Sequence, residues 1–99
     1  MKQDPEVAYD QEFQAKVFKS FLRDGLIIAM PSQRKKRKVL LDYMAEDFEF
    51  DRPYTELEVN FKILDHYDDY CTVRREMVAE GLLRREHGTY FREKEEESL

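Results

Sequence analysis

Apolar residues recur at helical spacing in the first quarter of the chain. Between Asp10 and Arg23 they fall on one face, which predicts an amphipathic helix. Asp10 can cap the start of this helix, and Gly25 can close its end in a left-handed conformation. The apolar face consists of Phe13, Val17, Phe18, Phe21 and Leu22.

The pattern then changes to a short continuous apolar run, Leu26 to Met30, which Pro31 ends. We interpret Leu26 to Ala29 as a strand that pairs with a hairpin later in the chain, so that a three-stranded sheet forms. Ser32 is expected to cap a second helix that runs to about Asp47. Its inward residues are expected to be Leu40, Tyr43, Met44 and Phe48.

The stretch from Tyr54 to Arg92 carries the most information, because it predicts helix, turn, helix and hairpin in that order. Thr55 and Glu58 have capping-box spacing and open a helix from about Glu56 to His66. Its apolar residues are Leu57, Phe61 and Leu64 on one face, flanked by Val59, Ile63 and Tyr67. Asp69 starts the next helix and Gly81 ends it, with Tyr70, Val73, Met77 and Val78 inward.

Two short strands complete this order, Leu82 to Arg85 and Thr89 to Arg92, with His87 and Gly88 between them. The order predicts an α+β fold that is winged helix-turn-helix-like. It has an N-terminal helix, a short strand, three helices and a C-terminal β-hairpin wing. The 99 residues are enough for one domain, with residues 1–9 as an N-terminal extension and 93–99 as an acidic tail.

Charge is unevenly distributed along the chain. The net charge is −5, which disfavours nonspecific binding of nucleic acid by the chain as a whole. However, Arg34 to Lys38, here called the basic run, holds five consecutive cations. Asp42 to Asp69 holds ten acids against two cations, and Tyr70 to Arg92 holds five arginines against three acids. One face could therefore meet phosphate, or the molecule could dock on itself.

The candidate nucleic-acid contacts lie in the basic run, on the second helix of the helix-turn-helix and on the wing. They are Arg34, Lys35, Lys36, Arg75, Arg84 and Arg85. Cations at a helix start with free N–H groups form a good anion site. Wing arginines can reach the phosphate backbone. The alternative for the basic run is a solvated face that balances the acidic segment, and for the wing it is cross-strand pairing with Glu86 or the tail.

Arg74 and Arg75 are adjacent but should behave differently. At 100° per residue Arg74 falls between Tyr70 and Met77 on the inward side, so its guanidinium needs a carboxylate partner. We expect this structural ion pair to involve Glu58 or Glu56 of the preceding helix. Arg75 points outward and is the better candidate for a base or phosphate contact.

The sequence offers little for catalysis, cofactors or metals, and we expect no enzyme and no cofactor. Its soft ligands are His66, His87 and Cys71, without metal-site spacing, and no nucleophile with a base or glycine-rich phosphate loop is recognisable. No small-molecule ligand is evident. A single cysteine favours a reducing cytoplasm, and no apolar run approaches a membrane span or a signal peptide, so no membrane partner is expected.

Several of these residues resemble a small bacterial family that is catalogued only as a domain of unknown function. The resemblance covers roughly Phe18 to Phe91, with Phe91 in place of an expected tryptophan. It rests on Tyr54 to Asn60 (Y-x-E-x-E-V-N), Asp69, Arg74, Arg75, Glu80 to Arg85 and Gly88 to Tyr90. It implies a bacterial domain that occurs alone or fused to the helix-turn-helix domains of transcription regulators. It carries no catalytic residues.

The sequence therefore leaves two functions open. One is a winged helix associated with transcription regulation that binds duplex DNA through the basic run, Arg75 and the wing. The other is a protein-interaction module of the same shape that contacts itself or another regulator domain and touches no nucleic acid. The basic run favours the first, whereas the net charge and the acids near Arg75 favour the second.

Overall fold

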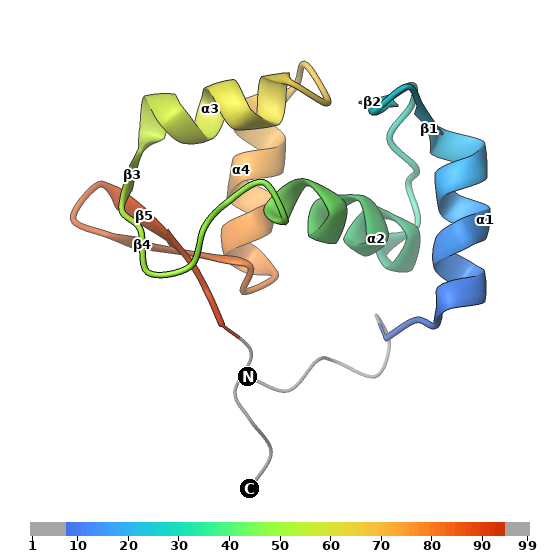
Figure 1. Cartoon of the computed structure of the whole chain (residues 1–99), viewed down its shortest axis with the longest axis horizontal. Helices are drawn as coiled ribbons and strands as arrows, with labels where there is room; N and C mark the ends of the chain where they lie inside the picture. The colour runs from blue at the N-terminus through green and yellow to red at the C-terminus, as the bar shows by residue number, and fades with distance from the viewer. Residues whose placement is uncertain (1–7, 95–99) are drawn as a thin grey trace, which may run out of the picture.

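The helix-turn-helix and its wing form one unit in the last two thirds of the chain. The computed structural model describes residues 8–94, so most of the extension 1–9 and of the tail 93–99 lies outside the described residues. The unit runs through α2 (Arg34–Ala45), β3 (Tyr54–Thr55), α3 (Glu56–Leu64), α4 (Tyr70–Ala79), β4 (Leu83–Glu86) and β5 (Thr89–Arg92). The predicted α+β, winged-helix-like fold is confirmed (Figure 1).

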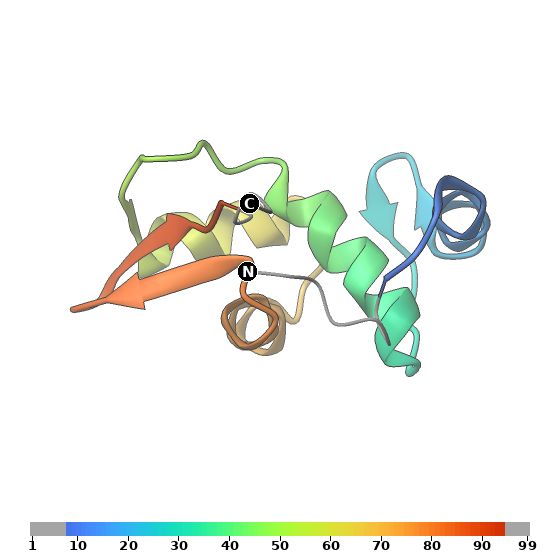
Figure 2. The same cartoon turned by 90° about the horizontal axis from the view of Figure 1, so that it is seen from below.

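The centre of the molecule is α2, which lies between α1 (Gln11–Phe21) on one side and α4 on the other (Figures 1 and 2). Its buried residues point in almost every direction around the helix: Val39, Leu40, Leu41, Met44 and Ala45. A helix that is apolar on most of its circumference belongs in a core. The basic run therefore opens a helix whose remainder is buried.

The strand prediction for Leu26 to Ala29 was wrong in its partner. That segment supplies β2 (Leu26–Ile27), which pairs with β1 (Leu22–Arg23), directly after α1. Asp24 and Gly25 form the turn, with φ of 53° and 80°. An Asp-Gly pair with two positive φ values makes the tight turn of a two-residue hairpin. Gly25 therefore serves this turn, and Leu22 caps the helix in an extended conformation.

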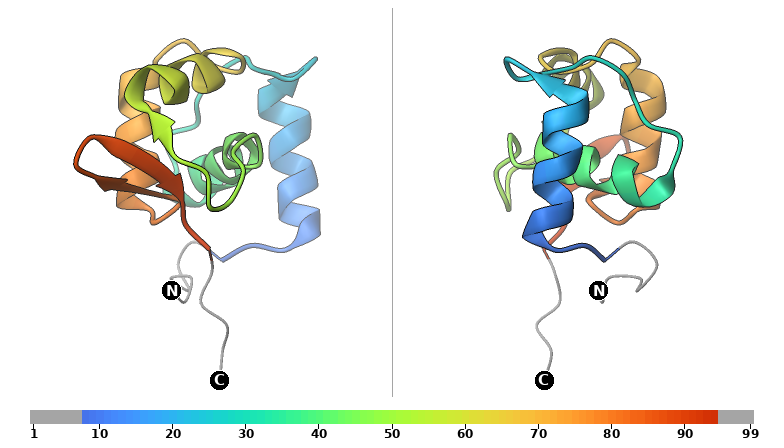
Figure 3. Two further views of the ribbon diagram at one scale, coloured as in Figure 1. Left: turned by 60° about the vertical axis from the view of Figure 1, so that its left-hand side comes forward. Right: turned by 90° about the vertical axis from the view of Figure 1, so that its right-hand side faces the viewer.

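The third strand of the wing sheet is instead β3, so that the strand order is β3-β5-β4. Tyr54 of β3 pairs with Tyr90 of β5, and Arg85 of β4 pairs with Tyr90 on the other side. The hairpin turn is His87 and Gly88, both at positive φ. Figure 3 shows the consequence, since the N-terminal helix and its small hairpin lie on the opposite side of α2 from the wing.

Three predicted helix starts are confirmed and one is not. The Asp10 carboxylate accepts from Phe13 N, Asp69 accepts from Thr72 N, and Thr55 with Glu58 forms a complete capping box. Ser32 does not cap α2, which begins one residue later than predicted. Its N-cap is Gln33, without a side-chain cap. The helical backbone bonds begin there, with Arg37 N donating to Gln33 O at 3.0 Å.

The face of α3 that enters the core is narrower than its apolar residues suggest. Val59 and Ile63 are fully buried, whereas Leu57 and Phe61 are 63% and 61% exposed. Leu64 is 41% exposed. The physical reason is that α4 and the sheet cover α3 on one side only, so the second apolar face faces solvent (Figure 1). Val78 of α4, predicted to point inward, is likewise exposed.

Candidate functional site

Two arginines of the basic run are ion-paired to α4. Arg34 donates to Glu80 through Nε at 3.0 Å and Nη2 at 2.9 Å, a bidentate pair. Arg37 donates to Glu76 and, at 2.9 Å, to the carbonyl of Pro31. The hydrogen bond to Glu76 raises the pKa of Arg37 above its ordinary value. These two cations therefore join α2 to α4 and neutralise the acids of α4.

Two lysines of the basic run are also engaged within the molecule. Lys38 is buried, and its ammonium lies 2.6 Å from the Asp42 carboxylate, which also accepts from the Tyr9 hydroxyl. The Lys35 ammonium lies 4.5 Å from the centroid of the Phe13 ring, a cation–π contact. Within residues 8–94, Lys36 alone of the basic run has no ion pair or ring contact.

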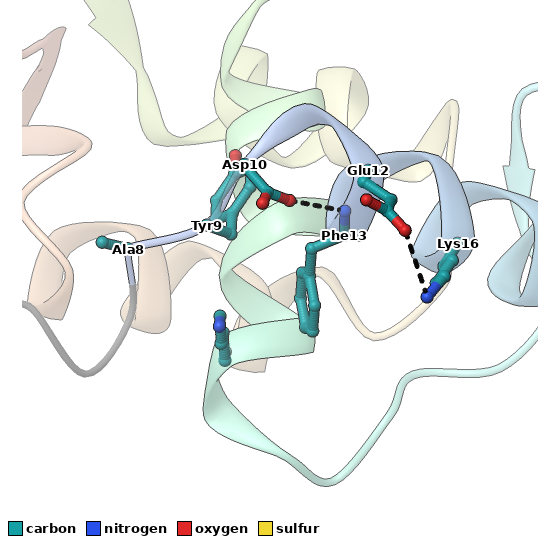
Figure 4. Close-up of a pocket in the computed structure, with 7 residues that line it drawn as sticks. Ala8, Tyr9, Asp10, Glu12, Phe13 and Lys16 are labelled. Atoms are coloured by element: carbon teal, nitrogen blue, oxygen red, sulfur yellow. Dashed lines mark hydrogen bonds and ion pairs between the residues drawn. The ribbon is translucent and has the colours of Figure 1, made fainter.

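An open hollow of about 460 Å³ lies beside this cation–π contact, between the start of α1 and α2 (Figure 4). Its charged groups already have partners. Asp10 caps α1, and Glu12 lies 3.7 Å from Lys16. A ligand site usually has a few polar groups that converge on an apolar pocket. This hollow has no such group left over among the described residues.

Arg74 is part of the joint between α3, α4 and β5. It is 8% exposed, donates to Asn60 Oδ1, and its Nε lies 3.7 Å from Glu56 Oε1. The Tyr90 hydroxyl donates to the same Glu56 oxygen at 3.2 Å. Glu58 lies elsewhere, 3.5 Å from Arg52, and closes the capping box. The sequence predicted Glu58 or Glu56 as the carboxylate partner of Arg74, and in the structure Glu56 is the one that lies close to it.

Arg75 lies on the opposite side of α4. Its side chain is exposed and makes no hydrogen bond or ion pair with the part of the chain that the structure describes. Its neighbours on that side of the helix, Cys71, Thr72 and Ala79, are uncharged and exposed. The outward face of α4 thus carries one cation.

The two wing arginines differ in the same way. Arg84 pairs with Glu86 at 3.0 Å and with Glu93 at 2.5 Å, and the hydrogen bond to Glu93 raises its pKa. Arg85 faces the other side of the sheet, where its guanidinium lies 5.9 Å from the Tyr90 ring. Four of the six nucleic-acid candidates therefore have no acidic partner within residues 8–94: Lys36 and Arg75, and also Lys35 and Arg85, which each contact an aromatic ring.

The sequence interpretation missed the outward face of α3. Leu57, Phe61 and Leu64, here called the α3 strip, are large apolar side chains exposed on one side of a single helix. A charged residue follows each of its members: the exposed acids Glu58 and Asp65 at the two ends and the half-buried Lys62 in the middle. The signal was present as spacings of four and three residues, but the same spacing is usual for a core face.

His66 lies at the turn between α3 and α4 and holds three segments together. Its Nδ1 lies 2.8 Å from Gly25 O, and its Nε2 lies 2.5 Å from Asp47 Oδ2. Burial alone lowers the pKa of His66, but these two hydrogen bonds outweigh it and the pKa is raised above its ordinary value. Among the described residues, no group of three or more His, Cys, Asp or Glu side chains could hold a metal ion.

A sequence model for a family described as "Uncharacterized protein conserved in bacteria (DUF2087)" matches residues 26–92. The chain belongs to this family. The DUF2087 match begins at β2 and ends with β5, so it contains α2, the helix-turn-helix and the wing, and it leaves α1 outside. No curated protein and no solved structure matches the chain. Within residues 8–94, no helix is long and apolar enough to cross a membrane.

Proposed function

We propose that this DUF2087 chain is a protein-interaction module with a winged-helix-like fold, which works without contacting nucleic acid. The observation that carries the proposal is the α3 strip, three large apolar side chains that the fold leaves exposed. Contiguous exposed apolar residues with a polar surround are typical of protein contact sites. The association with transcription regulators that the sequence resemblance implies is compatible with such a module.

The charges of the helix-turn-helix support the same proposal. In such motifs the first helix crosses the DNA backbone, and the start of the second contacts base edges. Here the turn between α3 and α4 holds Asp65, Asp68 and Asp69, all exposed. Carboxylates at that position repel phosphates. The arginines that could offset them, Arg34 and Arg37, are already paired with Glu80 and Glu76.

DNA binding remains the second candidate, because one observation favours it. Lys36, Arg75 and Arg85 come from α2, α4 and the wing, and none has an acidic partner in the described part of the chain. Cations of this kind could contact phosphates, as wing and recognition-helix arginines do. These three cations carry half the positive charge of the six contacts predicted from the sequence.

A titration of the full chain with mixed-sequence duplex DNA at about 50 mM salt separates the two candidates. We expect no saturable change in the anisotropy of labelled duplex. Saturable binding whose affinity falls with salt, with a log–log slope of roughly −0.9 per phosphate, would favour the second candidate. In that case Lys36→Ala and Arg85→Ala should each reduce the slope by about one, and Arg75→Ala should change the sequence preference.

A further inference from the structure

The α3 strip has the spacing of a helix–helix seam. Leu57 to Phe61 is four residues and Phe61 to Leu64 is three, which places the three side chains along one line of the helix. At 1.5 Å per residue the line is about 10 Å long, or two helical turns. A partner helix can supply three apolar side chains at the same spacing, in the way that amphipathic helices occupy grooves.

Acids gather at the carboxyl end of the α3 strip. The edge one position after its members carries Glu58, Lys62 and Asp65 in turn, so a cation lies between its two acids. Asp68 and Asp69 come directly after, in the exposed turn. The carboxyl end of α3 adds the negative end of the helix dipole at the same place. Arg52, 3.5 Å from Glu58, is a cation at the other end of this edge.

We propose that the α3 strip binds an amphipathic helix of a partner protein, one that carries Lys or Arg beside its apolar residues; this rests on the function proposed above. The apolar seam supplies contact area, and the basic flank pairs with Asp65 and its neighbours. A second copy of this chain fits less well. Two antiparallel α3 helices would bring Glu58 of one against Asp65 of the other, and like charges at such positions disfavour pairing.

The test uses the full chain and two synthetic helical peptides of two to three heptads. Both have Leu at the seam positions, and they differ only at the flanking positions, which are Lys in one and Glu in the other. Titration calorimetry measures binding to the parent, to Phe61→Ala and to Phe50→Ala. Phe50 is the matched control because it is 44% exposed and lies outside α3, against Arg92 of β5.

The Lys peptide should bind the parent at one to one, and Phe61→Ala should weaken it by about ten-fold or more, as loss of a central aromatic contact does. Phe50→Ala should leave the affinity unchanged, and the Glu peptide should not bind. The proposal is overturned if the Glu peptide binds equally, if Phe61→Ala changes nothing, or if neither peptide binds. If the chain binds neither peptide nor DNA, the basic amphipathic helix is ruled out as the partner, but the protein-interaction module is not. Salt-dependent DNA binding would instead contradict the proposed function itself.

Discussion

The inward face of the α3–α4 pair is packed into the core, whereas its outward face is exposed to solvent. On the inward face Val59, Ile63 and Arg74 are buried, and no buried side-chain nitrogen or oxygen of residues 8–94 lacks a hydrogen-bond partner. On the outward side, three large apolar residues of α3 stand in solvent, and Arg75 of α4 has no partner within residues 8–94. The core thus uses only two of the five apolar residues of α3. The other three need a different explanation, and contact with a partner supplies one.

The largest effect is expected on the inward face, from Ile63→Ala. Ile63 is fully buried between α3 and the core, so its truncation removes buried methylene groups and leaves a cavity. Such a change typically costs about 2–5 kcal/mol of the free energy of unfolding. Urea unfolding followed by far-UV circular dichroism measures it. A cost below about 0.5 kcal/mol, the usual range for surface positions, would contradict the assignment of this face.

The next effect separates the two adjacent arginines. Arg74→Ala removes a buried side chain and leaves Asn60 without its donor, which should cost about 1–3 kcal/mol. The loss is smaller than for a fully buried ion pair, because the Glu56 side chain is half exposed and can be solvated. Arg75→Ala should change stability by less than about 0.5 kcal/mol. Equal urea midpoints for the two variants would contradict the assignment of Arg74 to a buried position and Arg75 to an exposed one.

A smaller effect is expected from the pH dependence of the His66 contact. Burial lowers the pKa of His66, but Gly25 O, Asp47 and Asp65 favour the protonated ring and outweigh it, so the folded-state pKa is raised. The Tyr43 ring packs against the imidazole, with 5.1 Å between centroids. A raised pKa means that its contribution to stability is complete below the ordinary value near 6.5 and is lost as the pH rises through the folded value. Thermal unfolding at about pH 6 and pH 8.5 measures the loss in Tm. The loss in Tm between the two pH values should disappear in His66→Gln and persist in His87→Gln.

Local signals in the sequence predicted much of this fold. Asp10, Asp69 and the Thr55–Glu58 pair each act within four residues of their own position, and all three helix starts are where they were expected. The Asp24–Gly25 turn was equally local, but its signal was assigned to the end of a helix. The two residues of β3 have no periodicity, so only their pairing with Tyr90 identifies them as a strand.

The candidate site was harder to predict because its contacts are long-range. Arg34 and Glu80 are 46 residues apart, and nothing between them indicates that α2 lies across α4. The basic run therefore looked available for phosphate, although most of it is paired. In α3, apolar residues occur on two sides of the helix. Their spacing alone cannot show which side the rest of the chain covers, because that depends on long-range packing.

The measurement that tests the central claim most directly is the stability of a variant without the α3 strip. In the variant Leu57→Gln, Phe61→Gln and Leu64→Gln, glutamine retains helix propensity and removes the apolar surface. If the strip is an outward docking surface, its free energy of unfolding in urea should stay within about 1 kcal/mol of the parent. A loss of about 3 kcal/mol or more, comparable to a core truncation, would mean that the strip is part of the core and would contradict the account.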